Sequence, residues 1–170
     1  FFILKFCNGG VFVENIDFLA EAKKIEKDII RLRREIHMYP ELGFEEYRTS
    51  EMIDKTLRSL GMKTKKVAKT GVLGLLKGKN PGKTVAIRAD MDALPMQDKK
   101  DVSYCSRVPG KMHSCGHDAH TAILLGTAMI LSKMKDNIHG NVKFLFQPAE
   151  ETDGGALPMI KEGVLDNPKV

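Results

Sequence analysis

The sequence contains no tryptophan, and aromatic residues make up only 6% of its 170 residues. Cysteine is also sparse, with an odd total of three: Cys7, Cys105 and Cys115. So few cysteines exclude a disulfide scaffold and indicate a reducing compartment, which we expect to be the cytoplasm. No apolar run approaches the roughly 18 residues of a membrane-spanning helix. We therefore expect no membrane partner.

The sequence also lacks any block of like charge. Its net charge of +5 comes from lysines that are scattered among glutamates. A nucleic-acid-binding surface needs clustered basic residues, so we expect no nucleic-acid partner. A hydrophobic content of 42% and a charged content of 29% are ordinary for a globular domain, and the length suffices for one domain with a core.

The two ends of the sequence predict a fragment. Residues 1–15 begin apolar but have no basic start and no clear cleavage site, so we do not interpret them as a signal peptide. The chain starts at Phe1 rather than Met and stops at Val170 just after Asn-Pro. We expect residues 16–170 to form an incomplete domain, with residues 1–15 separate from it.

Apolar residues recur at helical spacing between Asp17 and Met38, where Asp17 is the expected N-cap and Pro40 ends the helix. We expect His37, near its end, to interact with the helix C-terminus rather than to bind a ligand. Further helices are expected at 45–60, 119–134 and 156–162. The helix at 119–134 is apolar on nearly all sides and is therefore expected to be buried.

Expected strands are mixed with these helices along the chain. Two of them are joined by Gly-Lys-Asn-Pro-Gly, which resembles a hairpin turn, and the last carries Leu145 on its second face, as in an interior strand. Together they predict an α/β fold, a mixed sheet flanked by helices. The expected strands are 62–67, 71–77, 84–89 and 141–147.

The densest functional signal is the stretch from His113 to His120. It holds three imidazoles, one thiol and one carboxylate, the nitrogen and sulfur donors that a zinc-type ion prefers. Gly116 permits the tight turn that lets Cys115 and His117 converge, and the following helix N-terminus favours a thiolate. Asp118 either caps that helix or orients an imidazole, and the two roles are compatible.

Two acidic pairs flank this stretch. Asp90 and Asp92 follow an expected strand and would share a face if the strand continued, although such a pair usually lies in a loop. Glu150 and Glu151 follow an interior strand, where one can bind a metal and the other can act as a general base. An extended backbone would point them in different directions. All three clusters lie at strand ends or at a helix start, where open α/β sheets place ligand sites.

A cysteine nucleophile is the rival interpretation, with Cys115 paired to His117 or His120. It leaves the Asp90–Asp92 and Glu150–Glu151 pairs without a role, so the metal hypothesis is favoured.

Four motifs resemble one known family, the amidohydrolase branch of the aminoacylase and carboxypeptidase G metallopeptidases. They are the stretches at 37–44, 87–95, 109–120 and 146–151, and the resemblance extends from about Ile16 to Val170. It implies the N-terminal part of a dinuclear-metal exopeptidase-like catalytic domain. The implied activity is hydrolysis of the amide bond of an N-acyl amino acid, a small-molecule substrate, by a metal-activated water.

The resemblance also implies roles for individual residues. Cys115, His117 and Glu151 match metal ligands, and Glu150 matches the general base. The wider superfamily carries a His-x-Asp where this chain has Asp90-Met-Asp92, so a tuning role is expected for Asp92 but a ligand role is doubtful for Asp90. Asp118 and His120 remain without a defined role. Zinc, manganese, cobalt and nickel all suit this donor set.

In one respect the sequence departs from the family. The family supplies two further histidine ligands downstream and an inserted domain that forms a homodimer, and neither is present here. We therefore expect residues 1–170 alone to hold an incomplete site, to bind metal weakly and to turn over little or no substrate. A non-catalytic remnant or interaction module is the alternative.

Overall fold

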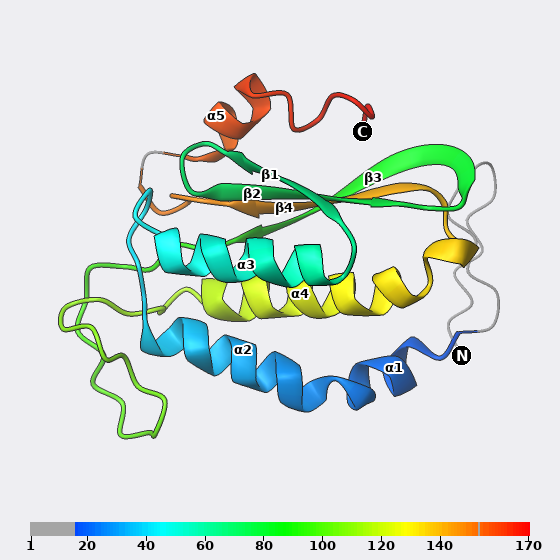
Figure 1. Cartoon of the computed structure of the whole chain (residues 1–170). Coiled ribbons are helices and arrows are strands. Elements are labelled where there is room, and N and C mark those ends of the chain that lie inside the picture. Colours follow the sequence, from blue (N-terminus) through cyan, green and yellow to red (C-terminus); the bar gives the residue numbers. More distant parts are fainter. Residues whose placement is uncertain (1–15, 153) are drawn as a thin grey trace.

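The computed structural model describes residues 16–152 and 154–170. Its centre is one mixed sheet of β1 (Lys63–Val67), β2 (Gly71–Lys77), β3 (Asn80–Asp90) and β4 (His139–Gln147). The strands lie in the order β1-β2-β4-β3, shown in Figure 1. The β1–β2 and β2–β4 pairs are antiparallel, whereas β3 runs parallel to β4. The expected mixed sheet flanked by helices is confirmed.

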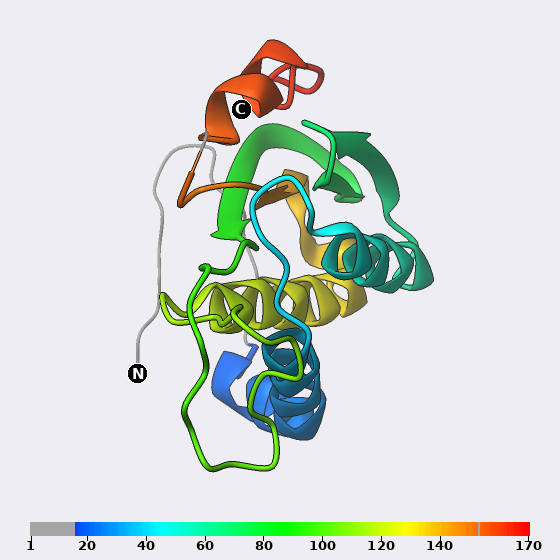
Figure 2. The same cartoon turned by 90° about the vertical axis from the view of Figure 1, so that its left-hand side faces the viewer.

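Helices cover both faces of this sheet. On one face lie α3 (Tyr47–Ser59) and α4 (His117–Lys133), and α1 (Phe18–Lys24) and α2 (Glu26–Met38) form a further layer against α4 (Figures 1 and 2). On the opposite face lies α5 (Ala156–Lys161), and a short 3₁₀ helix (Lys135–Asn137) precedes β4. Within the described ranges, no helix is long and apolar enough to cross a membrane.

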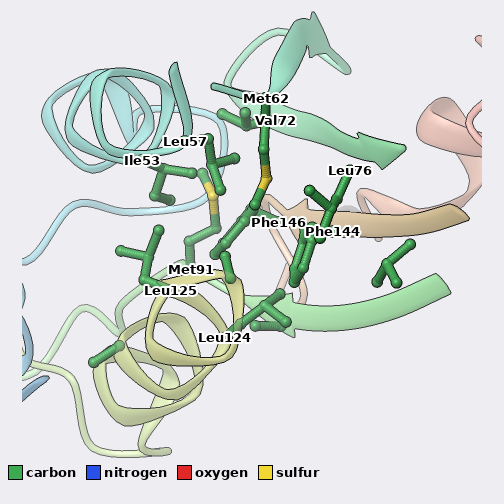
Figure 3. Packing of buried hydrophobic residues seen from close by; sticks show 14 of the residues in the cluster. Ile53, Leu57, Met62, Val72, Leu76, Met91, Leu124, Leu125, Phe144 and Phe146 are labelled. Atoms are coloured by element: carbon green, nitrogen blue, oxygen red, sulfur yellow. The ribbon is translucent and has the colours of Figure 1, made fainter. Parts of the chain in front are cut away.

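The main core lies between the sheet and the α3–α4 layer. Phe144 and Phe146 of β4 are fully buried there beside Leu125 of α4 (Figure 3). The apolar character of α4 on nearly all sides follows from its place, because it packs on the sheet with one face and on α2 with the other. A β-carbon at Gly126 would lie 2.7 Å from Cδ1 of Ile29, so a glycine allows α2 and α4 to approach closely.

The strand β4 is buried on both faces, which confirms the expectation of an interior strand. On its second face, Leu145 packs in a smaller cluster with Met159 and Val164. Lys143 is also buried on β4, and its Nζ donates a hydrogen bond to the Val164 carbonyl oxygen at 2.8 Å.

Two details of the sequence-based prediction are wrong. The strands at 71–77 and 84–89 do not form a hairpin, because β4 lies between them and pairs with both. The helix predicted over 17–38 is interrupted at Ile25, whose amide bonds to the Ala22 carbonyl three residues back. The expected N-cap is confirmed, since Asp17 accepts a hydrogen bond from the Ala20 amide at 3.0 Å. The interpretation of residues 1–15 falls outside the described residues.

Candidate metal centre

The three predicted clusters meet at one edge of the sheet. Because β3 and β4 are parallel, their carboxyl ends lie together, with Asp90 opposite Gln147 in the register. The helix α4 begins at the same edge with His117, directly after Gly116, which has a φ of 88°. That left-handed backbone favours glycine and turns the chain from the Cys115 loop into the helix.

Asp92 and His117 form the buried centre of the site. His117 Nδ1 lies 3.1 Å from both the Asp92 Oδ1 and the Asp92 carbonyl oxygen. Both are acceptors, so Nδ1 carries the proton and Nε2 presents its lone pair to the site. The hydrogen bond to Asp92 raises the pKa of His117. Burial alone would raise the pKa of Asp92, but the hydrogen bonds from His117 and the Glu151 and Glu150 amides lower it below its usual value.

Glu150 and Glu151 both turn toward this imidazole. His117 Nε2 lies 3.9 Å from Glu150 Oε2 and 3.8 Å from Glu151 Oε1. These three side chains form a group with geometry suited to one metal ion. The expectation that the two glutamates point apart is wrong, because the backbone is not extended there. Ala149 has a φ of 50°, and a turn follows it.

Cys115 lies at the exposed side of the site. A side-chain hydrogen bond with Glu151 raises the pKa of its thiol above the usual value. This shift is opposite in direction to the one expected from the helix N-terminus. A raised pKa also disfavours the cysteine-nucleophile alternative, because the thiolate is the attacking species. Neither Cys115 nor Cys105, which lies on the 96–111 loop, is in the candidate metal groups found in the described residues.

Asp90 and His120 also lie close to His117. The three residues form a second group suited to a metal ion, with His120 Nδ1 3.9 Å from Asp90 Oδ2. Arg88 competes for this carboxylate, since its Nε and Nη2 donate to the two Asp90 oxygens at 2.9 and 3.1 Å. His120 is more than half exposed. The structure therefore places both residues beside the centre without giving Asp90 a free carboxylate.

Asp118 orients an imidazole, but it is that of His37 and not that of His117. His37 Nδ1 lies 2.6 Å from Asp118 Oδ2, and Arg33 Nε forms an ion pair with the same oxygen at 2.8 Å. Lys100 Nζ donates to His37 Nε2 at 2.9 Å, so His37 donates through Nδ1. His37 is fully buried in the last turn of α2, and Asp118 and Lys100 engage its two ring nitrogens. Only its place in the 37–44 motif marked it in the sequence.

Two further buried residues lie near the centre, and the sequence analysis assigned neither of them an individual role. His113 is buried, and neither ring nitrogen has a hydrogen-bond partner among the described residues. Burial lowers its pKa from 6.5 to about 4. Glu46 is also fully buried, and its Oε1 accepts a hydrogen bond from the Ala149 amide at 2.9 Å. In the sequence Glu46 is one of several scattered glutamates, and no local pattern distinguishes it.

The donors fit a divalent metal ion. They comprise one imidazole nitrogen whose tautomer is set by a buried carboxylate, two convergent carboxylates and an adjacent thiol. A histidine that donates its second nitrogen to a carboxylate is the usual arrangement behind a metal ligand.

The fold and the site define the class of protein as an α/β domain with a candidate divalent-metal centre at the carboxyl ends of its parallel strands. The YXEP protein of Bacillus subtilis, described as a dinuclear metal binding peptidase from the M20 family, is 42% identical with a TM-score of 0.81. The match covers 85% of this chain and 41% of that one. The chain belongs to peptidase family M20/M25/M40, whose model matches residues 86–170.

Curated relatives carry names from the same class. Thermostable carboxypeptidase 1 of Saccharolobus solfataricus is 50% identical over 150 residues, which cover 86% of this chain and 38% of that protein. N-acyl-L-amino acid amidohydrolase of Geobacillus stearothermophilus is 48% identical over 145 residues, which cover 84% of this chain and 39% of that protein. The chain thus spans well under half the length of these relatives.

Proposed function

We propose that this chain forms part of the catalytic domain of a metal-dependent amidohydrolase that cleaves the amide bond of N-acyl amino acids. The observation that carries the proposal is the convergence of Glu150, Glu151 and the Asp92-oriented His117 at one point. The name of the Geobacillus relative supports the substrate class, and the dinuclear site of the YXEP protein supports two divalent ions.

In this proposal Cys115, His117 and Glu151 are metal ligands. The ions are zinc, manganese, cobalt or nickel, all of which accept this mixed donor set. A bound ion of this kind lowers the pKa of a coordinated water and polarises the substrate carbonyl. Asp92 holds the Nδ1 proton of His117 and the Glu151 amide, and so keeps both ligands in place.

Glu150 is the proposed general base. Its side chain is 40% exposed, and its Oε2 lies 3.9 Å from His117 Nε2. Glu150 is thus near the proposed ligands while remaining open to solvent and substrate. It takes a proton from the attacking water and returns it to the nitrogen of the leaving amino acid. Asp90, Asp118 and His120 have supporting roles around this centre and are not proposed as ligands.

The proposal extends to the setting of the whole protein. We place it in the cytoplasm as a homodimer that acts on a small molecule, without a nucleic-acid or membrane partner. The sparse cysteines support the cytoplasm, the scattered lysines support the lack of a nucleic-acid partner, and the homodimer follows from the family resemblance alone. Residues 16–170 are proposed as the N-terminal portion of the catalytic domain.

Two matched variants test the proposed roles. The protein, expressed with any sequence that continues beyond Val170, is stripped with a chelator, reloaded with Zn²⁺, Mn²⁺, Co²⁺ or Ni²⁺, and assayed on a panel of N-acyl amino acids. Glu150→Gln is expected to keep metal affinity and to lose nearly all turnover, whereas Glu151→Gln loses affinity itself. Activity that survives chelation, or that is lost only on thiol alkylation, would refute the proposal.

The isolated 1–170 chain gives a second test. We expect it to bind metal weakly and to turn over little or no substrate, and a rate equal to that of the longer protein would contradict this expectation.

A further inference from the structure

The segment from Glu41 to Glu46, which connects α2 to α3, packs behind the turn that carries Glu150 and Glu151. The contact is close enough to require a glycine. A β-carbon at Gly43 would lie 2.5 Å from Thr152 Oγ1 and 2.9 Å from the Ala149 β-carbon. The sequence singled out this segment only as part of a motif and assigned it no role.

Glu46 makes the polar part of this contact. Its Oε1 accepts a hydrogen bond from the Ala149 amide at 2.9 Å, and its Oε2 accepts one from Thr70 Oγ1 at 2.5 Å. The side chain is fully buried. Burying a carboxylate is costly unless its oxygens are satisfied, and both oxygens of Glu46 are.

The bond to Ala149 acts on a backbone that needs support. Ala149 has a φ of 50°, in the left-handed region that residues other than glycine rarely adopt. Glu46 holds the amide of Ala149, while Asp92 Oδ2 accepts a hydrogen bond from the Glu151 amide at 2.9 Å. The turn is therefore held by a buried carboxylate before Glu150 and by another after it.

This arrangement determines where the two glutamates point. Without the left-handed residue, the backbone after β4 would continue extended and direct adjacent side chains to opposite sides. With it, both carboxylates lie within 4 Å of His117 Nε2, at 3.9 and 3.8 Å.

We propose that Glu46 is a positioning residue of the metal centre, which acts through the Ala149 amide to direct Glu150 and Glu151 toward His117. The inference rests on the proposed function for its consequence, metal binding, but the positioning itself can be tested without a metal. Glu46 itself is not proposed to touch the metal or the substrate.

The test uses the protein with any sequence beyond Val170 and compares three variants by Co²⁺ titration, followed by absorption and by calorimetry. Glu46→Ala removes the acceptor and is expected to weaken Co²⁺ affinity about tenfold to a hundredfold, the usual effect of losing a residue that orients a ligand. Glu46→Gln is expected to restore affinity to near the wild-type value, because the amide oxygen still accepts from Ala149 and the amide nitrogen can donate to Thr70. Gly43→Ala pushes on the same turn without touching these hydrogen bonds, and is also expected to weaken affinity.

A control separates positioning from general stability. Ile53→Ala opens a cavity in the core on α3, so it is expected to lower the melting temperature while leaving Co²⁺ affinity unchanged. If Glu46→Ala fails to fold, Gly43→Ala and Glu46→Gln still decide the matter. The inference would be overturned if Glu46→Ala binds Co²⁺ with wild-type affinity. Where Glu46→Ala does not fold, wild-type affinity in Gly43→Ala would overturn it instead. A Glu46→Gln variant that binds Co²⁺ as weakly as Gly43→Ala would also overturn it.

Hydrogen exchange distinguishes a failure of the proposed function from a failure of the positioning role of Glu46. If the wild-type protein binds no Co²⁺, the proposed function is refuted, and exchange of the Ala149 and Glu151 amides in the metal-free protein then decides the positioning role. Faster exchange of both amides in Glu46→Ala, but not in Ile53→Ala, would support it. Unchanged exchange in Glu46→Ala would overturn it.

Discussion

Replacing Asp92 by asparagine tests the centre of the proposed site. Both carboxylate oxygens of Asp92 accept hydrogen bonds, Oδ1 from His117 Nδ1 at 3.1 Å and Oδ2 from the Glu151 amide at 2.9 Å. Asparagine has one oxygen and one NH₂ group, so in either orientation a donor faces a donor. A hydrogen bond to a charged group contributes about 1.5–3 kcal/mol. Since about 1.4 kcal/mol is a factor of ten, we expect Asp92→Asn to weaken metal affinity roughly tenfold to a hundredfold.

The assay is calorimetric titration of the metal-free protein with Zn²⁺ or Co²⁺, after circular dichroism has shown that the variant is folded. Asp90→Asn is the matched control, because it makes the same chemical change two residues away. The Asp90 carboxylate is engaged by the half-exposed Arg88, so we expect its loss to change affinity by less than about threefold. If Asp92→Asn binds as tightly as the wild type, or if Asp90→Asn is the more damaging change, the assignment of the two aspartates is wrong.

Three further predictions concern stability and reactivity. Phe144→Ala is expected to lower the free energy of unfolding by about 3–5 kcal/mol in urea titrations, because Phe144 is fully buried. Ile160 is half exposed, so Ile160→Ala should change the free energy of unfolding by less than about 0.5 kcal/mol. Equal effects of the two changes would contradict the assigned core. Burial raises the folded pKa of Glu46 above its ordinary value of 4.5, so the folded state retains this proton to higher pH than the unfolded state does. The stability that Glu46 contributes is therefore present below pH 4.5 and lost as pH rises through the folded pKa. Glu46→Gln should gain stability relative to wild type across that window in urea titrations, and a difference independent of pH would refute this. Iodoacetamide should label the exposed Cys115 slowly in the metal-free protein and still more slowly when Zn²⁺ is bound. Labelling of Cys105 is the control and should not change with Zn²⁺. Fast labelling of Cys115 that Zn²⁺ does not change would instead favour a thiolate nucleophile.

Much of the fold could be predicted because the burial of a helix or strand is reflected in the pattern of apolar residues within that segment. The apolar character of 119–134 on nearly all sides correctly indicated a buried helix, and the structure places it between the sheet and α2. Apolar residues on both faces of 141–147 correctly indicated an interior strand. The order in which strands pair in the sheet is not reflected in such a local pattern, so residues 78–82 were wrongly interpreted as a hairpin turn. The partner of both flanking strands, β4, comes more than fifty residues later.

The candidate site divides in the same way. Its residue types and its place at the ends of β3 and β4 follow from motifs and from the general behaviour of parallel strands. The directions of the side chains do not. Glu150 and Glu151 converge because Ala149 adopts a left-handed backbone, and that conformation is accompanied by a contact with Glu46, which lies over a hundred residues earlier in the chain.

The sequence by itself determined the class of fold, the family resemblance and the set of candidate donors, because periodicity and short motifs are properties of neighbouring residues. Only the tertiary structure decided which partners these donors have. It paired Asp92 with His117 and Asp118 with His37, and it brought Glu46 into hydrogen-bond contact with the Ala149 amide, next to Glu150 and Glu151. Each of these hydrogen bonds joins residues that are brought together only when the helices pack on the sheet, so no local pattern in the chain encodes them.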